Sequence, residues 1–218
     1  GWEAVGRLEL GRGGFCTGAL VAPDLVLTAA HCLYDDATGA RIDAAAMEFR
    51  AGFRSGRAEA YRGVRRAVVH PDYSFHGQDR MGRVAADVAL VQLDRPIRSP
   101  RIRPFAADGG LRPGQEVGVV SYATGRAEAP SLQEVCHVLE RASGVVMLSC
   151  SVDFGASGAP IFATGEGGPQ IVSVVSAKGE AEGKPVALAS ELSRTLGALH
   201  AALEAAPGDV LNRGMARS

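Results

Sequence analysis

Three side chains in separate parts of the chain are of the types that carry out nucleophilic hydrolysis. His31 ends the segment CTGALVAPDLVLTAAHC, Asp87 lies in the apolar run VAADVALVQL, and Ser157 lies in GASGAP. Cleavage of an amide by a serine needs a hydroxyl nucleophile, a base within hydrogen-bond reach, a carboxylate that orients the base, and N–H donors for the oxyanion. Glycines on both sides of Ser157 allow a sharp turn that exposes its hydroxyl.

Each of these residues also has an ordinary structural interpretation when it is considered alone. Serine in a Gly-rich turn is common, and a lone histidine beside a cysteine is usually structural. Asp87 is costly to bury in an apolar run unless something donates hydrogen bonds to it. An imidazole would do so, and so would local backbone N–H groups at the start of a strand.

The elements that must position these side chains are mostly short strands. Apolar runs such as GALV, LVLTAA, ALVQL, EVGVVSY and IVSVVSA alternate with Gly, Pro, Asp or Asn, which is typical of a β-sandwich or β-barrel. Residues 191–205 have leucines at helical spacing, with Ser190 as the expected N-cap. The Pro-rich stretch 94–114 predicts a solvated connection between two β units, and its arginines lack the aromatic partners of a nucleic-acid surface.

The four cysteines form two local pairs, Cys16 with Cys32 and Cys136 with Cys150. A turn around Ser143 separates two apolar runs, and each cysteine of the second pair lies seven residues from it, so a hairpin would place them opposite each other. Disulfides closing loops of this size would each stabilise the fold by roughly 3 kcal/mol and would indicate an oxidising compartment. Four reduced cysteines in a cytosolic core are the alternative. Metal binding is disfavoured because no CxxC or close Cys/His cluster is present.

Composition excludes several classes of function. The 218 residues carry a net charge of −1, so no overall field favours a nucleic-acid partner. Apolar runs all fall short of the roughly 18 residues of a membrane span. The first residues, GWEAVGRLEL, lack the features of a signal peptide, and we expect a mature or trimmed form.

Taken together, the motifs resemble those of the trypsin-like (chymotrypsin-fold) serine proteases of the bacterial secreted type. TAAHC resembles the segment with the family's histidine, DVAL the one with its aspartate, and GASGAP matches Gly-x-Ser-Gly-x-Pro, in the family's order. The segment HPDY at 70–73 resembles another family feature. The resemblance runs from about residue 16 to the terminal helix.

This resemblance implies an all-β fold of two antiparallel six-stranded β-barrels with a C-terminal α-helix and a cleft between the barrels. Residues 1–104 would form the N-terminal barrel, which carries His31 and Asp87. Residues 105–218 would form the C-terminal barrel, which carries Ser157 and ends in a helix at about 191–205.

The resemblance also assigns roles to the site residues. His31 would act as general base and then as general acid, Asp87 would hold the ring tautomer, and Ser157 would be the nucleophile. Backbone N–H groups of Gly155 and Ser157 would form the oxyanion hole.

Several positions depart from the animal digestive enzymes of the family. Ala156 replaces the aspartate that binds the new N-terminus on zymogen activation, and the spacing from Cys150 to Ser157 is closer to bacterial members such as the glutamyl endopeptidases. Ser151 stands where a trypsin places the aspartate that binds Arg or Lys, so cleavage after basic residues is not favoured.

The strand lining the substrate cleft shows a further departure. The family's Ser-Trp-Gly resembles Ser176, Ala177 and Lys178 here. We hypothesise that Lys178 either narrows the specificity pocket or offers its charge to an acidic side chain, and the alternative is that it points into solvent. With Ser151, these three residues are the predicted substrate-binding set.

The sequence therefore predicts a serine endopeptidase that acts on protein or peptide substrates. The alternatives are a catalytically silent protease-fold binding protein and a serine esterase, which would use the same acyl-enzyme chemistry. We expect no cofactor and no metal: Asp35, Asp36 and Asp43 are calcium-ligand types, but a solvated loop is the favoured interpretation. The expected protein is a monomer, secreted or periplasmic, without a nucleic-acid partner or a membrane span.

Overall fold

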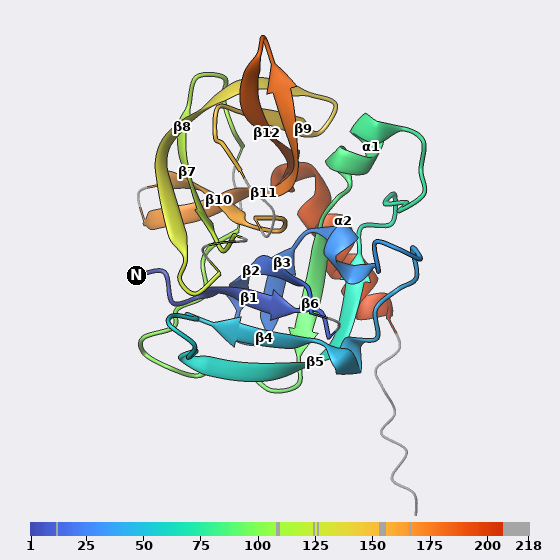
Figure 1. Cartoon of the computed structure of the whole chain (residues 1–218), viewed down its shortest axis with the longest axis vertical. Coiled ribbons are helices and arrows are strands. Elements are labelled where there is room, and N and C mark those ends of the chain that lie inside the picture. Colours follow the sequence, from blue (N-terminus) through green and yellow to red (C-terminus); the bar gives the residue numbers. More distant parts are fainter. Residues whose placement is uncertain are drawn as a thin grey trace, which may run out of the picture.

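The strands of the computed structural model form two closed, six-stranded antiparallel barrels, one above the other in Figure 1. The structure describes residues 1–11, 13–107, 110–123, 125, 127–152, 156–165 and 167–206. The first barrel has the strand order β1-β2-β3-β6-β5-β4 and the second β10-β11-β12-β9-β8-β7. The predicted fold class is thus confirmed.

The first barrel is built from β1 (Val5–Glu9), β2 (Phe15–Ala22), β3 (Leu25–Thr28), β4 (Glu48–Ala51), β5 (Ala60–Val69) and β6 (Ala89–Leu93). The 3-10 helices η1 (Ala30–Leu33) and η2 (Ala44–Ala46) lie between β3 and β4, and the short helix α1 (Arg80–Ala85) lies between β5 and β6. The second barrel is built from β7 (Glu116–Ser121), β8 (Ser131–Ala142), β9 (Val145–Leu148), β10 (Pro160–Gly165), β11 (Gly168–Ala181) and β12 (Lys184–Glu191). The helix α2 (Leu192–Ala205) follows β12.

Each barrel encloses its own apolar core, and a third core joins them. Leu20 and Phe49 are fully buried in the first barrel, and Leu148 and Ile161 in the second. The joining cluster contains residues from both barrels, including Leu27, Leu90, Val120, Tyr122, Phe162 and Ile171. Because burial of large aliphatic and aromatic side chains is the main stabilising contribution, this shared core fixes one barrel against the other.

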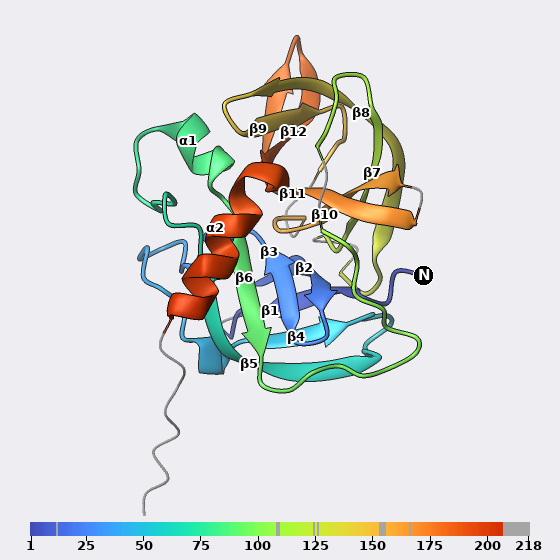
Figure 2. The same ribbon diagram turned by 180° about the vertical axis from the view of Figure 1, so that it is seen from behind.

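Two helices cross from one barrel to the other. α2 follows β12 but packs on β5 and β6 as well as on β11 and β12, and Figure 2 shows it running along both halves of the molecule. α1 is inserted in the first barrel but packs on β9 and β12 of the second. Neither helix has more than 14 residues, and no helix of the described part is long and apolar enough to cross a membrane.

The start of α2 differs from the prediction. Glu191, rather than Ser190, is the N-cap, and it makes no capping hydrogen bond with its side chain. Ser190 is still the last residue but one of β12, and its buried hydroxyl donates to the carbonyl of Val84 in α1, 2.6 Å away. The tertiary contact to α1 has therefore replaced the local capping role.

The hairpin of β8 and β9 carries the second disulfide. Ser143 and Gly144 both have positive φ, 52° and 83°, and form the two-residue turn, with Ala142 opposite Val145. A β-bulge between Val138 and Glu140 then shifts the pairing by one residue, so that Glu140 faces Met147 but Val138 faces Leu148. As a result Cys136 faces Cys150 with a Cα–Cα distance of 5.1 Å, and the expected disulfide is present. Without that bulge, Cys136 would face residue 151.

Candidate active site

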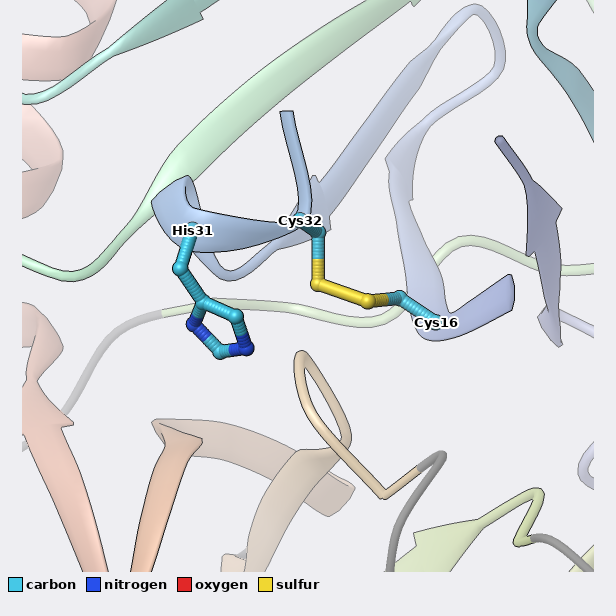
Figure 3. Close-up of side chains that lie close together, drawn as sticks. All are labelled: Cys16, His31 and Cys32. Carbon is cyan, nitrogen blue, oxygen red and sulfur yellow. A yellow bond between two sulfur atoms is a disulfide. The ribbon is translucent and has the colours of Figure 1, made fainter. Parts of the chain in front are cut away.

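His31 lies in η1, the short 3-10 helix that follows β3. Cys32 follows it and is bonded to Cys16 of β2, with a Cα–Cα distance of 6.3 Å. Figure 3 shows the imidazole and the disulfide projecting from the same side of this turn. The disulfide therefore ties the turn that carries His31 to the neighbouring strand, and 27% of the His31 side chain is exposed.

Asp87 holds both the backbone and the ring of His31. Its Oδ1 accepts the His31 backbone N–H at 2.8 Å, and its Oδ2 lies 2.7 Å from the ring Nδ1. An ionised carboxylate can only accept hydrogen bonds, so Nδ1 carries the proton and Nε2 keeps its lone pair. Asp87 is 4% exposed, and these bonds compensate the cost of burying its charge.

Ser176 of β11 supports the same carboxylate. Its hydroxyl donates to Oδ2 of Asp87, although the sequence pattern placed Ser176 among the substrate-binding residues. Ser176 is 8% exposed, so this donor works in a site that little water reaches. The second barrel thus contributes a hydrogen bond to the aspartate of the first.

The environment of His31 moves its pKa in two directions. Burial favours the neutral ring, whereas the charge of Asp87 and its hydrogen bond favour the protonated ring, and the net effect raises the pKa of His31 above its ordinary value of 6.5. Asp36 also raises this pKa and Arg83 lowers it. A protonated ring at His31 is therefore stabilised by its surroundings.

Ser157 lies in a turn that is bonded to both barrels. Its carbonyl accepts the backbone N–H of Thr17 in β2 at 2.9 Å, and the next residue, Gly158, donates to the carbonyl of Val175 at 2.9 Å. Val175 is the neighbour of Ser176, so one stretch of β11 holds both the serine turn and the Asp87 carboxylate.

Gly158 shows why glycine is needed in this turn. Its φ is +78°, and a Cβ there would lie 2.2 Å from Oγ1 of Thr28 and 3.0 Å from the nitrogen of Ala29. These two residues lead directly into η1 and His31. The peptide after Ser157 is thus packed against the segment that carries the histidine.

The Ser157 side chain is partly buried, and among the described residues no hydrogen bond joins its hydroxyl to the His31 ring. Catalytic hydrogen bonds are often long in a ligand-free protein and shorten when substrate binds. Gly155, the other predicted oxyanion donor, lies outside the described residues.

Thr17 is a structural residue of the site that the sequence analysis did not identify. It is fully buried, its carbonyl accepts the Thr28 hydroxyl at 2.8 Å, and its hydroxyl accepts the backbone N–H of Tyr122 at 3.0 Å. The only signal in the sequence was one polar residue in the apolar run FCTGALVA.

The predicted substrate-binding residues do not all line one cavity. Ser176 and Ala177 line a cavity of about 560 Å³ together with His31 and Asp87. Ser151 is exposed and lines a cavity of about 350 Å³ against β7 and β8. Lys178 is exposed on β11, opposite Ala187.

Few groups of the described residues could hold a metal. Donor atoms of Cys16, His31 and Cys32 lie within 4.8 Å of one another, but both sulfurs are in the disulfide and are not thiolate ligands. Asp35 accepts hydrogen bonds from the backbone and hydroxyl of Thr38, and Asp43 caps η2.

Two closed β-barrels with an aspartate–histidine couple at their junction are the chymotrypsin fold of the trypsin-like peptidases. The chain belongs to the family described as the trypsin-like peptidase domain, whose model matches residues 16–168. A solved structure of a Glu endopeptidase in complex with MPD superposes with a TM-score of 0.73 over 93% of this chain and 89% of that one. Their sequences are 18% identical, so this match concerns the fold.

Curated relatives agree with the family over shorter stretches. The bovine suppressor of tumorigenicity 14 protein homolog is 30% identical over 121 residues, which are 51% of this chain and 14% of that protein. The Drosophila melanogaster modular serine protease is 36% identical over 97 residues, 41% of this chain and 15% of that protein. Human cathepsin G is 34% identical over 103 residues, 45% of this chain and 36% of that protein. The chain thus matches well under two thirds of each relative.

Proposed function

We propose that this protein hydrolyses peptide bonds through an acyl-enzyme intermediate, with Ser157 as nucleophile, His31 as general base and acid, and Asp87 as the residue that orients His31. The observation that carries the proposal is the Asp87–His31 couple, in which both carboxylate oxygens are used and Nε2 is left as the base. A structural histidine would not need a buried carboxylate on its ring and its backbone at once.

In the first step the hydroxyl oxygen of Ser157 attacks the substrate carbonyl carbon while Nε2 of His31 takes its proton. The C–N bond then breaks, and the same proton goes to the leaving amine. Water hydrolyses the resulting ester by the same route, and Ser157 regains its proton from His31. Asp87 stays ionised and stabilises the imidazolium in both halves of the reaction.

The oxyanion that forms in both steps requires N–H donors. We infer that the backbone N–H groups of Gly155 and Ser157 supply them, by analogy with the family, because the turn at Ser157 is held from both sides by Thr17 and Val175. Such preorganised donors contribute roughly 3 to 4 kcal/mol each to the transition state.

The chain passes from one barrel to the other within two residues. The backbone N–H of Phe105 donates to Leu20 of β2 at 2.9 Å, whereas the carbonyl of Ala106 accepts from Ile171 of β11 at 2.8 Å. These contacts put the crossover between Phe105 and Ala106, within one residue of the expected boundary, and we infer units of about 1–104 and 105–218.

Substrate and compartment follow from the same proposal. The substrates are proteins or peptides, and the enzyme acts as a monomer. Two disulfides imply an oxidising compartment, which we infer to be extracellular or periplasmic. Ser151 in place of an acidic residue makes Arg or Lys before the cleaved bond an unfavoured choice.

Labelling with a fluorophosphonate tests the function directly. An activated Ser157 displaces fluoride and forms one phosphonate ester, seen as a single mass increment on intact protein. Ser157→Ala is expected to remove the label, and Ser99→Ala, in the connection between the barrels, is the matched control that keeps it. A native protein that is folded but takes no label and cleaves no peptide is a silent binding protein, and one that cleaves only esters is an esterase; either outcome would overturn the proposal.

A further inference from the structure

The cavity of about 560 Å³ beside the Asp87–His31 couple has one wall that the reaction itself does not use. This wall is formed by α1 and the loop before it, and it presents Tyr73, Phe75, His76, Arg80 and Arg83 toward the cavity. Because His31 and Asp87 line the same space, a side chain bound there belongs to a substrate residue close to the cleaved bond.

The wall is fixed by contacts to the second barrel. Val84 is buried with Val145 and Leu188, and its carbonyl accepts the hydroxyl of Ser190. At the other end of α1, Oδ1 of Asp79 caps the helix by accepting the backbone N–H of Gly82 at 3.0 Å. A short helix held at both ends keeps its side chains in place before substrate arrives, which lowers the entropic cost of binding.

Arg83 is held more closely than a surface arginine. It is partly buried, and its Nη1 donates to the carbonyl of Phe75 at 3.0 Å. Arg80 lies one turn earlier on α1 and is exposed. In the part of the chain that the structure describes, no carboxylate forms an ion pair with either guanidinium.

Three carboxylates lie near this cavity, and two of them accept hydrogen bonds from groups other than the two arginines. Both oxygens of Asp87 accept hydrogen bonds from His31 or Ser176, and the carboxylate of Asp79 accepts a hydrogen bond at the N-cap of α1. Asp36 is the remaining acidic residue in the lining, and it is exposed. Arg83 also borders a second cavity on the far side of α1, where Asp72 and Asp79 lie. The wall therefore offers two guanidinium groups to the cavity, and guanidinium groups are charged in proteins.

We propose that Arg80 and Arg83 form a subsite that binds a carboxylate side chain of the substrate one or two residues from the cleaved bond. The guanidinium of Arg83 supplies the held donor, Arg80 adds charge at the rim, and Phe75 and Tyr73 contact the aliphatic part of the bound Glu or Asp. This subsite rests on the proposed endopeptidase function and adds an acidic preference to it.

Matched peptides test the subsite without changing their length or shape. Fluorogenic peptides are made in pairs that differ at one position, which carries Glu in one peptide and Gln in the other. The varied position is one of the two before or one of the two after the cleaved bond, and kcat/KM is measured for both peptides of each pair. We expect Glu to be preferred at one of these positions by roughly two- to fivefold for each arginine contacted, the range of partly exposed ion pairs. The preference is expected to weaken as salt rises from 0.05 to 0.5 M, because ions screen exposed charges over about a Debye length.

Variants then assign the preference to the arginines. Arg80→Gln and Arg83→Gln are each expected to reduce the Glu/Gln ratio, and the double variant to bring it close to one. Arg83→Lys keeps the charge and is expected to keep most of the ratio. Arg98→Gln removes the same charge from the connection between the barrels and is expected to leave the ratio and the rates unchanged.

The outcomes separate this inference from the proposed function. A native enzyme that takes the fluorophosphonate label but cleaves every Glu and Gln pair equally overturns the subsite and leaves the function intact. Retention of the full ratio in the double variant, with its folding checked by thermal unfolding, also overturns it. A protein that neither labels nor cleaves overturns the function, and the subsite falls with it.

Discussion

The hydroxyl of Ser176 donates to Oδ2 of Asp87, the same carboxylate oxygen that receives the His31 ring. The donor comes from β11 of the second barrel and the acceptor from the first. Orientation of the histidine is therefore completed only when both barrels are docked.

Ser176→Ala is expected to reduce activity through Asp87 rather than through substrate contact. Hydrogen bonds to charged groups contribute roughly 1.5 to 3 kcal/mol, so kcat should fall by about ten- to a hundredfold with a small change in KM. Ser173→Ala is the matched control, since Ser173 is a buried serine of the same strand that donates to the Ser190 carbonyl. A rise in KM with kcat unchanged would instead assign Ser176 to substrate binding.

The raised pKa of His31 gives activity and stability opposite dependences on pH. The base must be neutral, so kcat/KM is expected to fall as pH drops through a pKa above 6.5. The protonated ring is stabilised only in the folded state, so its contribution to stability is complete below the unfolded pKa and is lost as pH rises through the folded pKa.

Asp87→Asn tests the cause of that shift. Loss of the carboxylate charge is expected to lower the pKa of His31, and loss of the correct tautomer to lower kcat by about 10⁴-fold. The pKa is measured by NMR titration of the ring, independently of activity. An unchanged ring pKa in the variant would contradict the assignment of the shift to Asp87.

Gly158→Ala is expected to destabilise the protein and to displace Ser157. A positive φ costs an alanine about 1 to 2 kcal/mol, and overpacking against Thr17 and Thr28 adds roughly 1 to 3 kcal/mol. Gly13→Ala is the control, because Gly13 has a φ of 86° but open space around its Cβ position. Equal losses of thermal stability in the two variants would show that crowding at the serine turn has no effect.

The two disulfides are expected to differ in their effect on catalysis. Replacing either pair by serine removes a crosslink that closes a loop of similar length, at a cost of about 3 kcal/mol in free energy of unfolding. Loss of Cys16–Cys32 should also lower kcat, since Cys32 follows His31, whereas loss of Cys136–Cys150 should affect stability alone. Chemical denaturation measures the loss of stability in each variant. The rate of fluorophosphonate labelling, measured below the unfolding temperature, reports the effect on catalysis.

Sequence patterns predicted the parts of this fold that depend on local chemistry. The alternation of apolar runs and turn residues indicated an all-β fold, and the leucine spacing indicated α2, whose described bounds begin at Leu192. The Cys136–Cys150 pairing followed from hairpin symmetry about Ser143. That symmetry is produced by the bulge near Leu139, since the turn itself is centred between Ser143 and Gly144.

Contacts between distant segments could not be predicted in this way. Ser190 suited an N-cap by type, but the nearby carbonyl of Val84 takes its hydroxyl. The role of Ser176 depends on a carboxylate 89 residues away, and the cationic wall at α1 depends on packing against β9 and β12. Residue type and spacing carry no information on such docking.

The crossing of α2 has a consequence for biogenesis. The helix is made after β12, yet it covers β5 and β6 of the barrel that is synthesised first. As the chain leaves the ribosome, that barrel keeps an apolar face open until α2 has been made, and such a face is a target for chaperones or for aggregation. Docking of α2 thus follows the synthesis of both barrels, and a nascent chain that stops before α2 would lack the helix that packs on both of them.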